Sequence, residues 1–164
     1  MSTEKLFILN PYNEKHLELV KQFEIKNNLD QKITESIKNI TENYQKEDYL
    51  SKMTNSNRIE ESLFLLESKE IVDICFIEAE KDIKTCKIRS SLENNPKNKQ
   101  MLLQATNYAL NTLNMEYVLL CISPADINTI KALSEKGYEN LGKEGNSIVF
   151  LKDNEETVKG QRMI

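Results

Sequence analysis

Apolar positions recur along the chain at two spacings, one typical of amphipathic helices and the other of strands. A short apolar run at residues 6–9 ends at Asn10-Pro11 and predicts a strand. Helical spacing follows twice, first after Asn13 and again from Asp30 toward Met53, with Asn13 and Asp30 as predicted N-caps. The second stretch carries one apolar stripe, made of Ile33, Ile37, Ile40 and Tyr44. Such a stripe predicts a helix packed on a sheet, with a partner-binding face as the alternative.

The middle of the chain is rich in strand-like segments. Three apolar segments joined by short polar links indicate an antiparallel meander, and they are residues 63–66, 71–79 and 83–92. A polar loop, a helix whose inner side runs from Met101 to Leu113, and a continuous apolar strand at 117–122 come next. A helix between a meander strand and a buried strand predicts a βαβ unit, and hence a mixed sheet.

The last part of the chain adds one helix and two strands. Ser123 as N-cap and Pro124 in the first turn predict a helix that closes at Gly137. Strand-like residues 138–141 and 147–151 follow, and then a polar tail over 153–164 that we expect to be frayed. The fold class is therefore α/β (α+β), with one domain over residues 1–152. We expect a mixed, mostly antiparallel sheet of about seven strands flanked by about four helices.

Composition narrows the function classes. The chain has 164 residues and a net charge of −4, and only three of its 22 basic residues are arginines, so we expect no nucleic-acid partner. No apolar run is long enough to span a bilayer, and no secretory signal begins the sequence, so we expect no membrane partner and a cytoplasmic protein. The three cysteines, Cys75, Cys86 and Cys121, have no metal-ligand spacing and predict reduced, buried thiols and no metal site.

The order of these elements resembles that of the GNAT superfamily of acyl-CoA N-acyltransferases, over about residues 6–152. The strongest local support is Lys136-Gly137-Tyr138, which stands where that family closes its last helix before a strand. The resemblance implies a seven-stranded GNAT-like fold that binds acetyl-CoA as co-substrate. It also implies that the strand at 83–92 splays from the strand at 117–122, because the pantetheine arm lies in that gap and pairs with strand backbone.

The resemblance places the acyl-CoA site around the start of the helix after this strand. The residues expected to bind the co-substrate are Ser90, Ser91, Leu92, Lys97, Asn98, Lys99, Gln100 and Met101. The family's glycine-rich diphosphate motif is missing here, because no glycine precedes Gly137. Lys97 and Lys99 could neutralise a diphosphate as point charges. The alternative is a polar loop that binds no ligand.

Candidate bases for the acceptor amine are Glu78, Glu80 and Glu93, near the ends of two strands. Glu78 and Glu80 share a strand face with apolar residues, where burial would suit a base. The alternative is that all three are solvated strand-end carboxylates. Many members of the GNAT superfamily have a tyrosine on the last helix that protonates the leaving thiolate, and this chain has no tyrosine on that helix. His16, the only histidine, is interpreted as a surface residue.

The predicted function is therefore transfer of an acetyl group from acetyl-CoA to a primary amine of a small molecule or peptide. The alternative is a catalytically inactive GNAT-like fold that acts as a binding or regulatory module. A further interpretation is that the helical stretch at 30–53 is a protein partner site, for a homodimer or for another protein.

Overall fold

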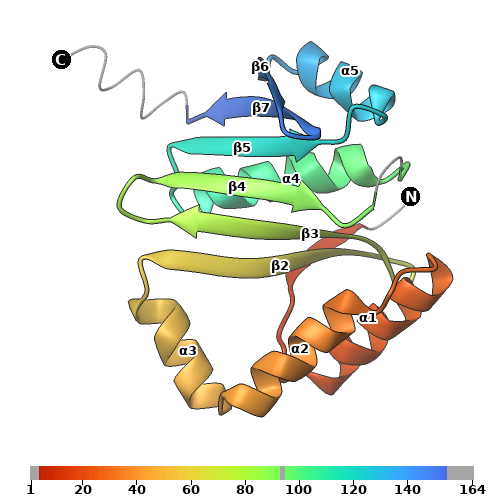
Figure 1. Cartoon of the computed structure of the whole chain (residues 1–164), viewed down its shortest axis with the longest axis vertical. Coiled ribbons are helices and arrows are strands. Elements are labelled where there is room, and N and C mark those ends of the chain that lie inside the picture. Colours follow the sequence, from red (N-terminus) through yellow and green to blue (C-terminus); the bar gives the residue numbers. More distant parts are fainter. Residues whose placement is uncertain (1–3, 93–94, 155–164) are drawn as a thin grey trace.

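A computed structural model of the chain describes residues 4–92 and 95–154, and Figure 1 shows their arrangement. In this part of the chain, seven strands form one sheet and five helices flank it. The elements are β1 (Lys5–Ile8), α1 (Glu14–Lys26), α2 (Lys32–Asn43), α3 (Lys46–Asn55), β2 (Arg58–Glu67), β3 (Glu70–Glu80), β4 (Thr85–Ser90), α4 (Asn98–Asn111), β5 (Tyr117–Ile122), α5 (Ile127–Glu135), β6 (Glu139–Glu144) and β7 (Ser147–Asp153).

The sheet has the order β1-β2-β3-β4-β5-β7-β6. Strands β1 to β4 pair antiparallel, β4 and β5 pair in parallel, and β5, β7 and β6 pair antiparallel again. The antiparallel meander, the βαβ unit and the mixed α/β sheet predicted from the sequence are confirmed. The parallel pair requires a crossover connection, and α4 supplies it behind the sheet (Figure 1).

The two faces of the sheet carry different cores because neighbouring strand residues point to opposite sides. Leu63 and Leu65 of β2 pack in the core that contains Met101 and Leu102 of α4. Phe64, between them, packs with residues of α1 and α2 instead. We call these the α4 face and the α1–α2 face. The helix α3 has no fully buried residue and lies against the start of β2 (Figure 1).

Two predicted helix ends are confirmed. The Asn13 side chain accepts hydrogen bonds from the backbone N–H groups of Lys15 and His16 and caps α1. Gly137 follows α5 with a φ of 82°, and the Tyr138 N–H donates to the Leu133 carbonyl, as in a Schellman ending.

Two predicted N-caps are wrong. Asp126, and not Ser123, caps α5, because its carboxylate accepts from the Thr129 N–H, and the helix begins at Ile127. Asp30 does not cap α2. A carboxylate from the preceding helix, Glu24, accepts from the Ile33 and Thr34 N–H groups at 3.3 and 2.8 Å. A cap brought in from another helix cannot be found from local sequence spacing.

Three boundaries also differ from prediction. The stretch 30–53 is two helices, since Tyr44 is extended between α2 and α3, which is why five helices form. Strand β2 begins at Arg58, five residues before the apolar run, because its first half alternates polar and partly buried residues. Asp153 still pairs with Tyr117, so the predicted tail begins inside β7. Among the described residues, no helix is long and apolar enough to cross a bilayer.

Candidate functional site

The candidate site lies where the parallel strands β4 and β5 end and α4 begins. Pairing runs from Thr85 opposite Tyr117 to Arg89 opposite Cys121, which covers every residue of β4 except Ser90. The predicted splay is therefore wrong for most of the strand, and any parting is confined to residues beyond Arg89 and Cys121. Fully buried side chains explain this, since Ile88 and Leu120 pack side by side in the α4 core.

A chain of polar side chains bridges this end of the sheet on the α4 face. The Ser90 hydroxyl donates to the Asn98 Oδ1, and the Asn98 amide donates to the Asp126 Oδ2 at 2.6 Å. Asn98 and Asp126 are only 2% and 3% exposed. The carboxamide of Asn98 thus links the end of β4, the first turn of α4 and the cap of α5 across the predicted acyl-CoA opening.

Lys97, a predicted phosphate ligand, is held by two carboxylates. Its Nζ lies 2.8 Å from Glu4 Oε1 and 3.0 Å from Glu67 Oε2. Hydrogen bonds to Glu4 and Glu67 raise the pKa of Lys97 above its ordinary value, so the ammonium stays charged. Two carboxylates around one ammonium leave a net negative charge, which is unfavourable for a diphosphate unless the pairs exchange.

The other predicted co-substrate ligands are spread between the surface and the core. The Ser91 N–H donates to the Ile74 carbonyl at 2.9 Å and so continues the β3–β4 ladder. Leu92 packs against the α1–α2 core, whereas Met101 is fully buried in the α4 core. Lys99 and Gln100 are exposed in the first turn of α4. The structure thus brings Ser90 and Asn98 into contact, directs the Lys97 ammonium toward Glu4 and Glu67, and turns Met101 away from solvent.

Asp73 is a buried acid that the sequence reasoning missed. It lies at the start of β3 with no exposed surface, its Oδ1 accepts from the Ile74 N–H at 2.9 Å, and its Oδ2 lacks a partner within the described residues. Burial raises its pKa to about 7, and Asp126 adds to this increase. An acidic residue inside the apolar run 71–79 is the signal that could have identified it.

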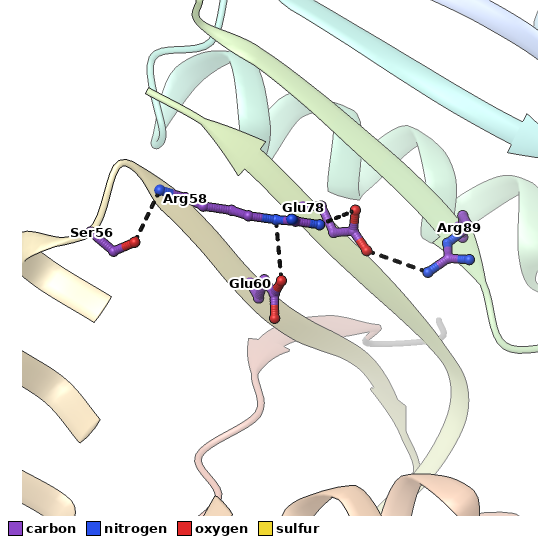
Figure 2. Close-up of polar contacts among 5 residues, drawn as sticks. All are labelled: Ser56, Arg58, Glu60, Glu78 and Arg89. Carbon is purple, nitrogen blue, oxygen red and sulfur yellow. Dashed lines mark hydrogen bonds and ion pairs between the residues drawn. The ribbon is translucent and has the colours of Figure 1, made fainter. Parts of the chain in front are cut away.

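On the α1–α2 face, Glu78 is at the centre of an ion-pair network drawn in Figure 2. Its Oε2 lies 2.9 Å from Arg58 Nη2, and its Oε1 lies 3.4 Å from Arg89 Nη2. Arg58 Nε is also 3.2 Å from Glu60 Oε1. Both oxygens of Glu78 are therefore occupied by guanidinium groups. Of the other candidate bases, Glu80 is exposed at the end of β3, and Glu93 lies outside the described residues.

His16 is more enclosed than its interpretation as a surface residue implied. Its Nδ1 accepts a hydrogen bond from the Asn10 N–H at 3.0 Å, and its ring meets the Phe64 ring edge-on at 5.0 Å. Burial lowers its pKa. His16 therefore ties the loop after β1 to α1 and lies apart from the Glu78 network.

Similarity to known proteins is found at the level of the fold. No protein-family description and no curated protein matches the sequence. Among solved structures, the N-acetyltransferase PseH of Campylobacter jejuni in complex with acetyl coenzyme A matches with a TM-score of 0.59 at 10% identity, over 93% of this chain and 99% of that chain. A probable acetyltransferase from Staphylococcus epidermidis matches with a TM-score of 0.55 at 19% identity, over 93% and 99%.

A dodecameric spermidine N-acetyltransferase from Vibrio cholerae matches with a TM-score of 0.61 at 11% identity, over 96% of this chain and 97% of that chain. Identities this low establish architecture and leave chemistry open. The chain has the fold of the GNAT acyl-CoA N-acyltransferases.

Proposed function

We propose that this protein is an N-acyltransferase that moves an acetyl group from acetyl-CoA to the primary amine of a small molecule or peptide. The observation that supports it is the βαβ unit. The first turn of α4 stands at the carboxyl ends of the parallel strands β4 and β5, where backbone N–H groups and the helix dipole favour an anion. The three reduced cysteines fit a cytoplasmic protein.

In this proposal, acetyl-CoA lies across the end of β4 near Ser90, Ser91 and Leu92. Its diphosphate lies on the first turn of α4, with Lys97, Asn98, Lys99 and Gln100 around it and Met101 supporting the helix from the core. Binding requires two exchanges. First, the Lys97 ammonium leaves Glu4 and Glu67 and binds phosphate oxygens. Second, a ligand amide replaces the Asn98 carboxamide between Ser90 and Asp126.

The acceptor reacts on the α1–α2 face, where Glu78 is the base and Glu80 is an alternative. Glu93, outside the described residues, is the other alternative base. The carboxylate takes one proton from the acceptor ammonium and leaves a neutral amine. The amine nitrogen attacks the thioester carbonyl carbon, so the C–N bond forms and the C–S bond breaks. The thiolate leaves with the electron pair and takes the second proton from nitrogen, which yields the amide and free CoA.

A second candidate is a GNAT-like fold that binds a partner without catalysis. The contacts of Lys97 and Asn98 favour it, because both side chains already have protein partners at the expected diphosphate position. It needs no exchange of ion pairs, and it is consistent with a first turn of α4 that lacks glycine.

Thermal unfolding with acetyl-CoA separates the two candidates. A ligand at a hundred times its dissociation constant adds about 2.7 kcal/mol, which is roughly 5–10 °C in Tm for a chain of this size. We expect such a shift, and release of CoA thiol when primary amines are added. Glu78→Gln should then lower turnover while preserving the acetyl-CoA shift. No shift at millimolar acetyl-CoA would leave the non-catalytic candidate.

Asn98→Ala provides a matched test of the path taken by acetyl-CoA. Removing the carboxamide leaves Asp126 Oδ2 buried without its donor and should cost about 1–3 kcal/mol of stability. If acetyl-CoA displaces that carboxamide, the variant should bind it more tightly than the natural chain does, although its own Tm is lower. Weaker binding by a folded variant would contradict this path.

Self-association of this chain can be measured directly. Some similar structures are assemblies, as the dodecameric spermidine enzyme shows for its own chain. We propose at least a homodimer, to be checked as a concentration-dependent mass in analytical ultracentrifugation.

A further inference from the structure

Arginine is rare in this chain, and its placement is selective. The 22 basic residues include three arginines, and the other bases are lysines. Arg162 lies outside the described residues, while Arg58 and Arg89 both contact Glu78, from β2 and β4. Arginine differs from lysine because its rigid, planar guanidinium presents two parallel N–H donors that can bind both oxygens of one carboxylate. We call this donor arrangement the fork. Two forks at one point suggest a site where that geometry is used.

The present contacts leave much of each fork free. Arg89 touches Glu78 through Nη2 alone, and its Nε and Nη1 have no partner within residues 4–92 and 95–154. Its side chain is 57% exposed, against 35% for Glu78. Arg58 engages Glu60 through Nε and Glu78 through Nη2. Neither guanidinium makes a two-point contact with a single carboxylate, so Arg89 in particular can accept a second anion.

The position of Arg89 connects this network with the reaction. Arg89 forms the last residue pair between β4 and β5, opposite Cys121, so it marks the point beyond which the strands can part. Its strand neighbour Ser90 begins the polar bridge to α4 on the other face. On the α1–α2 face, Phe76 pairs with Arg89 in register, and Glu78 lies two residues further along β3. Figure 2 shows the Glu78 carboxylate and the Arg89 guanidinium facing each other.

We propose that the acceptor carries a carboxylate beside its amine, of which a free amino acid is the simplest case, and that Arg89, with Arg58 in support, binds that carboxylate. This inference rests on the proposed N-acyltransferase function and names its substrate class. The acceptor carboxylate binds the Arg89 guanidinium and displaces Glu78 Oε1 from it. Glu78 Oε1 then accepts a proton from the adjacent ammonium of the acceptor. Arg89 is thus a specificity-determining residue, and the substrate itself releases the base.

The side-chain Nε–Hε signals of arginine test this binding without any need for turnover. The whole chain gives three such signals, and Arg58→Lys and Arg89→Lys assign two of them. Titration with amino acids should shift the Arg89 signal in a saturable way, whereas the matching amino-acid amides, which lack the carboxylate, should leave it unmoved. An Arg89 signal that ignores both series overturns the inference even if amines are acetylated.

Kinetics give the second readout when acetyl-CoA is turned over. Amino acids should exceed their amides in kcat/KM, and Arg89→Lys, which keeps the charge, should raise KM for the acid about tenfold and leave the amide unchanged. Lys143→Gln is the control, since it removes a full charge from an exposed position in β6, which β5 and β7 separate from β4, and should change KM less than about threefold. Equal losses for acid and amide, or a larger effect of Lys143→Gln, would contradict recognition by the fork. Saturable signal shifts without turnover would reject only the enzyme proposal.

Discussion

Three carboxylates of the described residues are almost wholly buried, and each has a different set of partners. Glu24 is 1% exposed and accepts from two backbone N–H groups and the Thr34 hydroxyl. Asp126 caps α5 and accepts from the Asn98 amide. Asp73 has a donor for Oδ1 only, among the residues that the structure describes. A buried carboxylate with an unpaired oxygen favours the protonated form, so Asp73 should destabilise the fold at alkaline pH.

Asp73→Asn should flatten the dependence of stability on pH. Burial raises the pKa of Asp73 from 3.8 to about 7. At pH values between these two, the carboxyl group is protonated in the folded state and ionised in the unfolded state. The free energy of unfolding therefore falls as pH rises through this window, by up to about 4 kcal/mol from this group. Urea unfolding at pH 4, 5.5 and 8 should show a smaller decline in the variant. Parallel curves for the two proteins would refute the assignment, and Asp48→Asn on exposed α3 is the control.

At the scale of elements, the ends of helices show where local sequence is sufficient. Asn13 caps the start of α1 and Gly137 ends α5 through hydrogen bonds that involve only residues one to four positions away, and both were predicted. The start of α2 depends on Glu24, which reaches it from α1 across a turn. The sequence near Asp30 contains a plausible local cap, but Gln31 takes a left-handed φ of 57° and makes no side-chain cap bond. Tertiary contacts override local preference there.

Replacement of Glu24 by Gln should therefore loosen the junction between α1 and α2. The amide nitrogen would face backbone donors that now meet a carboxylate, so we expect a loss of about 2–3 kcal/mol in the free energy of unfolding. Chemical denaturation measures it. Glu35→Gln changes an exposed acid in the first turn of α2 and should cost less than about 1 kcal/mol. Similar losses in both variants would mean that the dipole alone, and not the buried bonds, holds this junction.

At the scale of the molecule, element order predicted the architecture, and site detail could not follow from it. The apolar segments 71–79 and 83–92 with their short polar link, and the continuous run at 117–122, were sufficient for the meander and the crossover. The polar contacts at the start of α4 join residues far apart in sequence, such as Asn98 with Asp126 and Lys97 with Glu4. The Arg58–Glu78–Arg89 network likewise joins three strands. None of these pairs has a spacing that a single sequence reveals.

The cysteines report on the whole fold, because two of them lie at its centre. Cys75 and Cys86 have no exposed surface, and burial raises the pKa of the Cys75 thiol well above its ordinary value and that of Cys86 to about 12. Cys121 is only partly buried, on the α1–α2 face. Since the thiolate is the reactive form, a thiol reagent should modify Cys121 first in the native protein.

The other two thiols should react together, at a rate set by opening of the core beneath α4, because α4 must leave the sheet before either side chain is reached. Labelling followed by intact mass gives both phases. Addition of denaturant should accelerate the second phase in step with unfolding, and Cys121→Ser should remove only the first. Simultaneous modification of all three cysteines under native conditions would show that α4 leaves the sheet without global unfolding, and that the core beneath α4 is not part of one cooperative unit.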